Sequence, residues 1–334
     1  MSIMSRQFQL AKRPSGLPGP EDFKLVEHPL DTPAKGQILI RNQWLSVDPY
    51  MRGRMVDRKT YIPAFELDQP MEGAALGIVV DSNDDGFAPG DVVSHFSGWR
   101  DHALIDASSA NRIELAAPMP AYLGPLGFPG LAAYAGLLRI GRPKAGDTVF
   151  VSAAAGSVGS LVAQIAKIKG CRVVGSVGSE EKARWLREEA GVDAVINYNA
   201  ASDLRAALAE AAPEGIDIYF DNVGGAQLEA AIAAAKDFAR VVLCGMIAQY
   251  NGEPVGPRNI YAAVEKSLRL EGFISPNHLD LWQDFQRDVT QWIAEGKVRS
   301  RETIVDGLEN APKAFLGLFA GENIGKMLVR LSDG

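Results

Sequence analysis

A short apolar strand that turns directly into an amphipathic helix is the feature that most constrains this chain. The strand is expected over 148–152, and the turn after it contains Gly156 and Gly159. Apolar residues then recur at helical spacing as far as Gly170, which predicts a helix. The first turn of such a helix can bind a phosphate, with Gly156 letting the backbone approach a pyrophosphate and Gly159 letting the helix pack closely. Ala154 stands where the pattern G-x-G-x-x-G usually begins, so this motif alone also fits an ordinary strand–helix turn.

The sequence around this motif alternates between strand and helix patterns. Further strands are expected over 172–176, 194–197, 216–221, 240–245 and 268–274, and helices near 180–190, 203–211 and 226–235. Strands separated by helices form βαβ units with parallel strands. Six such strands predict a doubly wound parallel sheet of the Rossmann type, which binds dinucleotides.

The two ends of the chain follow a different pattern. As far as about residue 120, short strands alternate with Pro, Gly and Asp turns, which predicts a mostly β domain. After an amphipathic helix over 279–295, a last strand is expected over 326–331, outside the repeat. We therefore expect an α/β protein with a β domain over 1–122, a cofactor domain over 123–298, and a return to the β domain over 299–334.

Composition and charge narrow the class of partner. The 334 residues carry a formal net charge of -7, which argues against nucleic acid or an anionic membrane as the main partner. No apolar run is long enough to span a membrane and no signal pattern is seen, so a cytoplasmic protein is expected. Cys171 and Cys244 lie in apolar segments and are expected to be buried thiols. Because no His/Cys cluster has metal-ligand spacing, no metal site is expected.

The second expected strand of the repeat indicates which dinucleotide is bound. It ends without the acidic residue that holds the ribose 2′-hydroxyl of NAD. Glu180 and Glu181 follow, and we interpret them as favourable charges in the first turn of the next helix. Lys182 lies in the same turn and can offer a positive charge to a 2′-phosphate. NADPH is therefore expected, although a lysine at a helix start can also be a solvated side chain.

With these residues identified, the chain resembles the medium-chain dehydrogenase/reductase superfamily, in the zinc-independent branch of alkenal, prostaglandin and curcumin-type double-bond reductases. The resemblance covers nearly the whole chain and is carried by the segments 45–55, 153–159, 221–225, 256–261 and 321–327. It implies a GroES-like β domain that encloses a Rossmann domain. Zinc-using relatives carry an early cysteine, a Gly-His-Glu segment and a four-cysteine lobe. Here Asp48 lies near the first position, Met71 and Glu72 lie at the second, and the lobe is absent, so zinc is not expected.

The resemblance also implies which residues contact the cofactor. On this basis Gly156, Ser157, Val158 and Gly159 would lie on the pyrophosphate, and Lys182 and Tyr198 near the adenosine phosphate. Asn222 would reach the cofactor after the fourth strand. The nicotinamide side would be lined by Cys244, Gly245, Met246, Ile247, Phe273, Ile274 and Asn323. Tyr198 and Asn323 also have a simpler interpretation, as a residue that caps a strand end and as a turn residue.

Without a metal, reduction of a carbon–carbon double bond is the expected reaction for a bound NADPH. A hydride would go to the β-carbon of an enone or enal, and Tyr261, helped by the cofactor ribose, would stabilise the enolate. Tyr50 is the second candidate donor or a wall of the substrate pocket, and an interdomain packing role is the alternative. Met246 and Tyr250 would shape the pocket. The alternatives are an NADPH quinone oxidoreductase and a protein that only binds NADPH, and the resemblance suggests a homodimer.

Overall fold

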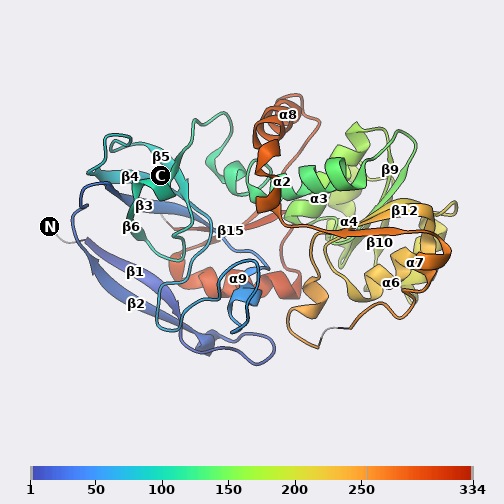
Figure 1. The fold of residues 1–334 in the computed structure, drawn as a ribbon, viewed down its shortest axis with the longest axis horizontal. Coiled ribbons are helices and arrows are strands. Elements are labelled where there is room, and N and C mark those ends of the chain that lie inside the picture. The colour runs from blue at the N-terminus through green and yellow to red at the C-terminus, as the bar shows by residue number, and fades with distance from the viewer. Residues whose placement is uncertain (1–2, 254, 332–334) are drawn as a thin grey trace. The chain divides into compact units, whose positions relative to one another are not determined.

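The computed structural model describes residues 3–253 and 255–331, which form two compact units (Figure 1). A β-rich unit holds residues 3–123, 302–323 and 327–331, and an α/β unit holds residues 124–301 and 324–326. The segments 299–301 and 324–326, which we expected in the β domain, thus belong to the α/β unit. Backbone hydrogen bonds explain their placement, because Gly325 donates to Ala155 (2.7 Å) and Lys326 to Arg301 (2.9 Å).

The α/β unit is built on a parallel sheet, and this confirms the expected Rossmann-type fold class. In the described residues the strand order is β10-β9-β8-β11-β12-β13, and every pairing between neighbours is parallel. The order runs outward from β8 in one direction and then returns to the other side of β8 with β11, as in a doubly wound sheet. The strands are β8 (Thr148–Val151), β9 (Arg172–Val177), β10 (Ala194–Asn197), β11 (Ile216–Asp221), β12 (Ala235–Leu243) and β13 (Arg269–Gly272).

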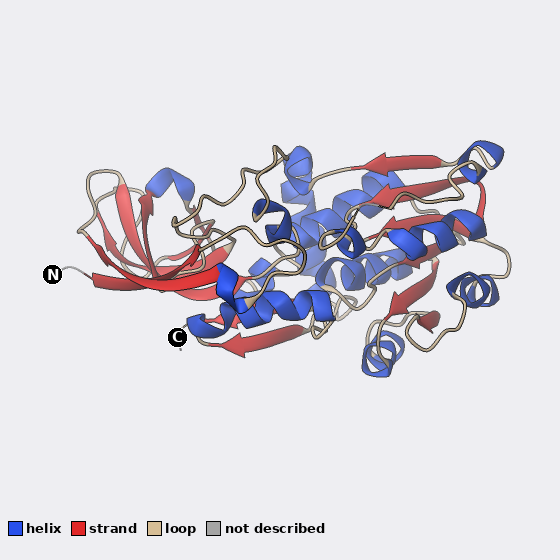
Figure 2. Cartoon of the chain, turned by 90° about the horizontal axis from the view of Figure 1, so that it is seen from below, coloured by secondary structure: helices blue, strands red, loops and turns tan. Residues whose placement is uncertain are grey.

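Helices of this unit lie on both sides of the sheet in the view of Figure 2. They are α2 (Phe128–Ala135), α3 (Ser157–Ile168), α4 (Glu180–Glu188), α5 (Leu204–Ala211), α6 (Gly225–Ala234), α7 (Ala262–Glu265) and α8 (Trp282–Ala294). Helix α8 begins later than the expected residue 279, because residues up to Leu281 form a tighter 3₁₀ turn with a non-helical residue, His278. Helix α2 continues into a π-helical segment, Gly136–Gly141, and neither was expected from the sequence.

The β-rich unit contains two sheets, and strands from the end of the chain join the larger one. Its strands are β1 (Ile3–Leu10), β2 (Phe23–Leu30), β3 (Gln37–Ser46), β4 (Ala75–Ser82), β5 (Val92–His95), β6 (His102–Asp106), β7 (Asn111–Arg112), β14 (Glu302–Asp306) and β15 (Lys326–Arg330). Strands β1 and β2 form a separate antiparallel pair, and the larger sheet has the order β14-β15-β3-β4-β5-β7, with β6 paired to β3. The expected last strand is β15, which pairs antiparallel with β3.

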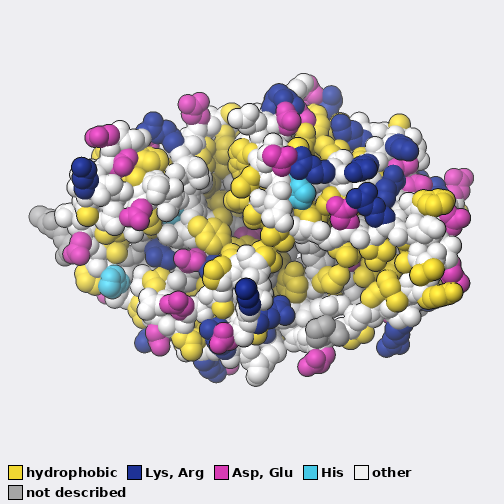
Figure 3. Space-filling model, viewed as in Figure 1, with side chains coloured by type: hydrophobic (Ala, Val, Ile, Leu, Met, Phe, Trp, Pro, Cys, Tyr) yellow, Lys and Arg dark blue, Asp and Glu magenta, His cyan; other side chains and the backbone are white. Residues whose placement is uncertain are grey.

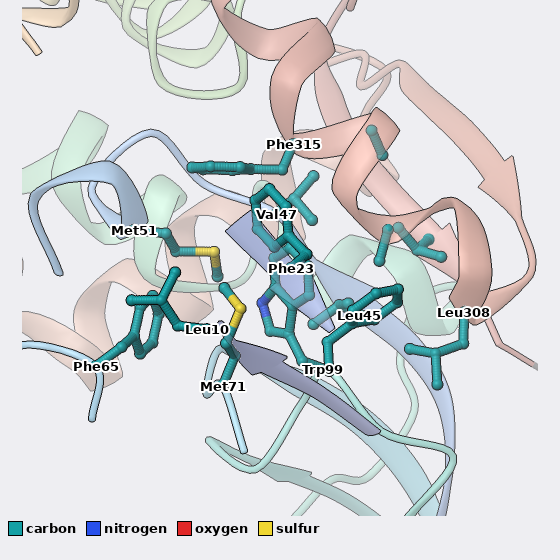
Figure 4. Packing of buried hydrophobic residues seen from close by; sticks show 14 of the residues in the cluster. Leu10, Phe23, Leu45, Val47, Met51, Phe65, Met71, Trp99, Leu308 and Phe315 are labelled. Carbon is teal, nitrogen blue, oxygen red and sulfur yellow. The ribbon is translucent and has the colours of Figure 1, made fainter. Parts of the chain in front are cut away.

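The core of the β-rich unit joins the start and the end of the chain (Figure 4). Trp99 is fully buried, stacks on Phe23 with ring centroids 6.0 Å apart, and meets the edges of Phe8 and Phe315. Phe315 comes from α9 (Ala311–Ala320), a helix that the sequence analysis did not predict. The short helix α1 (Met51–Arg54) contributes Met51 to the same core.

Charged side chains of both signs are found on the surface. On the face shown in Figure 3, acidic and basic side chains are interspersed rather than gathered into one large patch of a single sign. Within the described residues, no helix is both long and apolar enough to cross a membrane.

Candidate cofactor and substrate site

The turn before α3 presents the start of that helix without a side-chain cap. Gly156 is the N-cap residue, with φ -81° and ψ 175°, and it has no side chain to cap the first turn. Ser157 and Val158 follow and are half-buried. The turn is shaped by Ala153, a non-glycine residue with φ 47°, in the left-handed region. The arrangement is that of a helix N-terminus with exposed backbone N–H groups, which can bind an anion.

Gly159 allows α3 to lie directly on this turn. A Cβ added at Gly159 would come within 2.9 Å of the Cα of Ala154 and closer still to the carbonyl oxygen of Ala153. At Gly156 the nearest atom to such a Cβ would be the same carbonyl oxygen, at 3.2 Å. The two glycines therefore differ in degree: a Cβ at Gly159 would clash with the backbone, whereas one at Gly156 would be tight against a single carbonyl oxygen.

The carboxyl end of β9 leads into α4 and places Lys182. Ser179 caps α4, accepting a hydrogen bond from the backbone N–H of Lys182 (3.4 Å). The Lys182 side chain is half-buried, and this burial lowers its pKa from the usual range. Glu180 pairs with Arg187 at 2.8 Å and Glu181 with Arg301 at 3.3 Å, so both acidic residues of the first turn are engaged in ion pairs.

Tyr198 lies against the same end of β9. A Cβ on Gly178 would be 2.7 Å from the Tyr198 hydroxyl oxygen, so the phenol ring rests beside a residue without a side chain. The neighbouring Asn199 donates from Nδ2 to the carbonyl of Gly178 (2.8 Å), and the Tyr198 backbone N–H donates to Val177 (3.0 Å). Burial raises the pKa of the Tyr198 phenol. Tyr198 and the first turn of α4 thus flank the end of one strand.

At the ends of β8 and β11, a buried polar cluster fixes the backbone around Asn222. The Asn222 backbone N–H donates to the Ser152 hydroxyl (2.9 Å), and its side-chain Nδ2 donates to the Ser152 carbonyl (2.8 Å). Asp221 is fully buried, and its Oδ1 accepts hydrogen bonds from the Tyr219 hydroxyl (2.7 Å) and from the backbone. Burial raises the pKa of Asp221, and the hydrogen bonds that its carboxylate accepts oppose this.

Residues 244–250 form a loop that folds back on residues 221–223. The backbone N–H groups of Cys244 and Gly245 donate to the Asp221 carbonyl (2.9 and 3.0 Å), and that of Ile247 donates to Asn222 (3.3 Å). The Met246 N–H donates to the Tyr250 hydroxyl (3.5 Å). Burial raises the pKa of the Cys244 thiol to about 12, so this thiol stays protonated at neutral pH.

Phe273 and Ile274 follow β13 on the same side of the sheet ends. The Phe273 N–H donates to Leu243 (3.4 Å), and its ring meets Phe220 edge-on, with centroids 6.4 Å apart. Ile274 is half-buried. Asn323 lies in the β-rich unit, in the turn between α9 and β15.

The two tyrosines that are candidate hydrogen-bond donors to the substrate differ in exposure. Tyr261 precedes α7 in the α/β unit, and its side chain is 70% exposed. Tyr50 precedes α1 in the β-rich unit, and its buried hydroxyl has no hydrogen-bond partner among the described residues. Burial, and secondarily the charge of Asp48, raises the pKa of the Tyr50 phenol, which therefore stays protonated as a donor.

Several residues of this region were missed by the sequence analysis. They are the buried residues Ser152, Tyr219 and Asp221, together with Gly178 and Asn199. The available signal was the presence of Ser152 and Asp221 at the carboxyl ends of apolar strands, because ligands of doubly wound sheets bind at those ends. Among the described residues, no group of three or more His, Cys, Asp or Glu side chains is placed to hold a metal ion.

Known proteins are similar to this chain over its whole length. Residues 6–113 match the family model for the N-terminal domain of oxidoreductase, and residues 157–295 match the model for zinc-binding dehydrogenase. The chain is 42% identical over 336 residues to the NADPH-dependent curcumin reductase of Escherichia coli (strain K12), covering 98% of this chain and 97% of that protein. It is 40% identical over 339 residues to the 2-alkenal reductase (NADP(+)-dependent) of Nicotiana tabacum, with 99% and 98% covered. The chain belongs to the medium-chain dehydrogenase/reductase superfamily, in the branch of these reductases.

A solved structure agrees with this membership. CurA from Vibrio vulnificus, in complex with NADPH, superposes on this medium-chain dehydrogenase/reductase with a TM-score of 0.93. The two chains are 43% identical, and the match covers 98% of this chain and 100% of that one. The family expected from the sequence motifs is therefore confirmed.

Proposed function

We propose that this chain uses NADPH to reduce the carbon–carbon double bond of α,β-unsaturated ketones and aldehydes. The observation that carries the proposal is the start of α3, where the first turn of the helix lacks a side-chain cap beside a close-packed glycine turn. The substrate class is supported by the similarity to proteins named curcumin reductase and 2-alkenal reductase.

The residues of the α/β unit fit NADPH. The start of α3 offers the backbone N–H groups of Ser157, Val158 and Gly159 to a pyrophosphate, whereas the Gly156 N–H donates to the Ala153 carbonyl (2.9 Å) and contributes an open approach instead. Lys182 and the ring of Tyr198 flank the end of β9, where a 2′-phosphate would find a positive charge and no competing carboxylate at the strand end. The nicotinamide half would lie along the strand ends beyond, at Asn222, Cys244, Gly245, Met246, Ile247, Phe273 and Ile274.

The reaction needs a hydrogen-bond donor from the protein. When bound, NADPH supplies the hydride that adds to the β-carbon of the substrate. Negative charge then collects on the carbonyl oxygen, and the α-carbon gains one proton, which gives the saturated ketone or aldehyde. Tyr261 is the phenol that we assign to that oxygen, the cofactor ribose hydroxyl is a further donor, and Tyr50 is the alternative to Tyr261. Met246 and Tyr250 complete the pocket.

A substrate panel tests the reaction class. NADPH oxidation should be steady with 3-nonen-2-one and slow with benzoquinone, and the product should be the saturated ketone. Faster turnover of benzoquinone would favour a quinone oxidoreductase instead. Tight NADPH binding without turnover of any enone, enal or quinone would favour a binding protein.

We also propose that the protein is a homodimer joined through β13. This strand is at the end of the sheet order, so its outer edge has no strand partner among the described residues. Antiparallel pairing of two copies about Leu270 would place Arg269 of each opposite Glu271 of the other, which is a self-complementary arrangement. Sedimentation should show a dimer that Glu271→Arg weakens and that the double exchange with Arg269→Glu restores. A monomeric parent protein would contradict this proposal.

The location of the protein is a separate proposal. A cytoplasmic reductase is consistent with the use of NADPH and with two free cysteines, Cys171 and Cys244. Cell fractionation would test it.

A further inference from the structure

Three buried side chains join the carboxyl ends of β8 and β11, the strands between which the sheet reverses its order. Ser152 directly follows β8, and Tyr219 and Asp221 lie near the end of β11. All three are at most 1% exposed. Ligands of doubly wound sheets bind at this reversal point, outside the strand ends. The Ser152–Tyr219–Asp221 cluster therefore lies directly beneath the place where such a ligand would bind, without being exposed to it.

The carboxylate of Asp221 accepts most of the hydrogen bonds in the cluster. Its Oδ1 accepts hydrogen bonds from the Tyr219 hydroxyl (2.7 Å) and from the backbone N–H groups of Val223 (2.9 Å) and Gly224 (2.8 Å). The Ser152 hydroxyl lies 3.3 Å from the same oxygen. The other carboxylate oxygen, Oδ2, is buried and has no hydrogen-bond partner among the described residues. A buried carboxylate with one oxygen unsatisfied is destabilising, so its presence calls for a role other than stability.

The hydrogen bonds of this cluster hold two loops at once. The Asp221 carboxylate fixes residues 223–224, and its backbone carbonyl accepts from Cys244 and Gly245 in the second loop (2.9 and 3.0 Å). Ser152 holds Asn222 by accepting two hydrogen bonds, one from the Asn222 backbone N–H to the Ser152 hydroxyl and one from the Asn222 side-chain amide to the Ser152 carbonyl. The two loops also meet directly, since Ile247 donates to Asn222 (3.3 Å). The side chains of the cluster therefore hold the first loop directly, and they hold the second loop through the backbone carbonyls of Asp221 and Asn222.

We propose that Ser152, Tyr219 and Asp221 are positioning residues that hold the loops 222–224 and 244–247 in the geometry that binds the nicotinamide half of NADPH. This inference rests on the proposed function, because the two loops are the segments that we assign to that half of the cofactor. The three residues act through Asn222 and the backbone of the second loop, and none of them touches the cofactor. The cluster joins the two halves of the sheet beneath the proposed site. Removing one of its side chains should therefore change cofactor binding more than the folding of either half.

Tyr219→Phe, Ser152→Ala and Asp221→Asn test this role, with NADPH affinity measured by the fluorescence of the bound cofactor. Each variant should bind NADPH more weakly, by about 3–30-fold, the range typical of residues that couple to a site without touching it. The KM for NADPH should rise by a similar factor, while the KM for the enone at saturating NADPH should stay within about twofold. Fluorescence reports binding without turnover, so a parent that binds NADPH but reduces no enone would overturn the proposed reaction and leave this test intact.

Tyr134→Phe is the matched control, because Tyr134 is also a buried tyrosine of the α/β unit that donates to a carboxylate, Asp288 (2.7 Å). Loss of the Tyr134 hydroxyl should lower the melting temperature by about as much as Tyr219→Phe does and leave the NADPH affinity unchanged. The proposal would be overturned by unchanged NADPH affinity in folded Tyr219→Phe and Ser152→Ala, or by an equal loss of affinity in Tyr134→Phe. Because those two variants remove only a hydroxyl, they decide the matter even if Asp221→Asn does not fold.

Discussion

The hydroxyl of Tyr198 lies so close to Gly178 that a Cβ on the glycine would be 2.7 Å from the phenol oxygen. The absence of a side chain at Gly178 is therefore what allows the ring to rest at the end of β9. Because Tyr198 is held there by contact rather than by a hydrogen bond to its hydroxyl in the described structure, its position should respond to small changes at Gly178.

Gly178→Ala should displace the Tyr198 ring and weaken NADPH binding by about threefold to tenfold, or roughly 0.7–1.4 kcal/mol. The contact is with the end of a side chain that can move, so the protein should remain folded. Tyr198→Phe removes the contacting hydroxyl, and adding Gly178→Ala to it should cause a smaller further loss of affinity than in the parent. Additive losses in this double-mutant cycle would show that the two residues act independently.

Lys182 should determine the preference for NADPH over NADH. Lys182→Met removes the positive charge at the start of α4 and should weaken NADPH binding about tenfold, or roughly 1.4 kcal/mol, with NADH binding unchanged. Arg184→Met is the control, since Arg184 is an exposed cation on the same helix. Competitive titration of the two cofactors measures the ratio of affinities. Equal affinities for NADPH and NADH in the parent would refute the assignment of Lys182.

The two glycines of the α3 turn should respond differently to alanine. Gly159→Ala forces a Cβ against the backbone of Ala153 and Ala154, which cannot move without shifting the helix, so we expect a loss of about 1–3 kcal/mol in unfolding free energy. Gly156→Ala has ordinary extended dihedral angles and a nearest contact at 3.2 Å. It should lower the melting temperature less than Gly159→Ala does and weaken NADPH binding, because the methyl group would stand where the pyrophosphate approaches. Equal melting temperatures for the two variants would contradict this difference.

Tyr261→Phe and Tyr50→Phe should separate the roles of the two phenols. A donor to the developing enolate contributes to kcat, and general acid assistance of this kind is worth about 10²–10⁴-fold. If Tyr261 is that donor, Tyr261→Phe lowers kcat while NADPH affinity, measured by fluorescence, stays the same. Tyr50→Phe leaves no unpartnered hydroxyl buried at that position, so its stability should be equal to or greater than that of the parent. An unchanged kcat in both variants would remove both residues from the mechanism.

The elements that could be predicted from the sequence are those with a recognisable pattern in a short stretch of residues. The six strands of the parallel sheet are apolar and are separated by helices, and the turn at Gly156 and Gly159 has a recognisable spacing. The last strand, β15, was also predicted, because its apolar run stands outside the repeat. Helix α9 was missed although it contributes Phe315 to a core, since its apolar residues are interrupted by Gly317 and lie between two short strands.

The candidate site was predicted less completely than the fold, for a physical reason. Lys182 and Tyr198 were named from a missing acid and a family pattern. The contact between Tyr198 and Gly178 depends on the pairing of β9 with β10, which no local pattern reports. Likewise, Ser152 and Asp221 are 69 residues apart in sequence and meet only because β8 and β11 are neighbours. Tertiary contacts determine which polar residues are buried at strand ends, and these contacts exist only in the folded sheet.

His95 should make the stability of the protein sensitive to acid. The Nε2–H of its buried ring donates to Asn42 Oδ1 (2.8 Å), and its Nδ1 accepts a hydrogen bond from the Ser97 N–H (3.1 Å), a contact that requires the neutral ring. Burial lowers the pKa of His95 to about 3, against about 6.5 for an unfolded histidine. Between these values the unfolded chain binds more protons, so stability falls as the pH is lowered from about 6.5 toward 3, by about 2 kcal/mol between pH 7 and pH 5. Urea unfolding at these two pH values should show a smaller difference for His95→Gln than for the parent, with the exposed His28→Gln as control. An equal pH dependence in His95→Gln and the parent would exclude His95 as the source of the acid sensitivity.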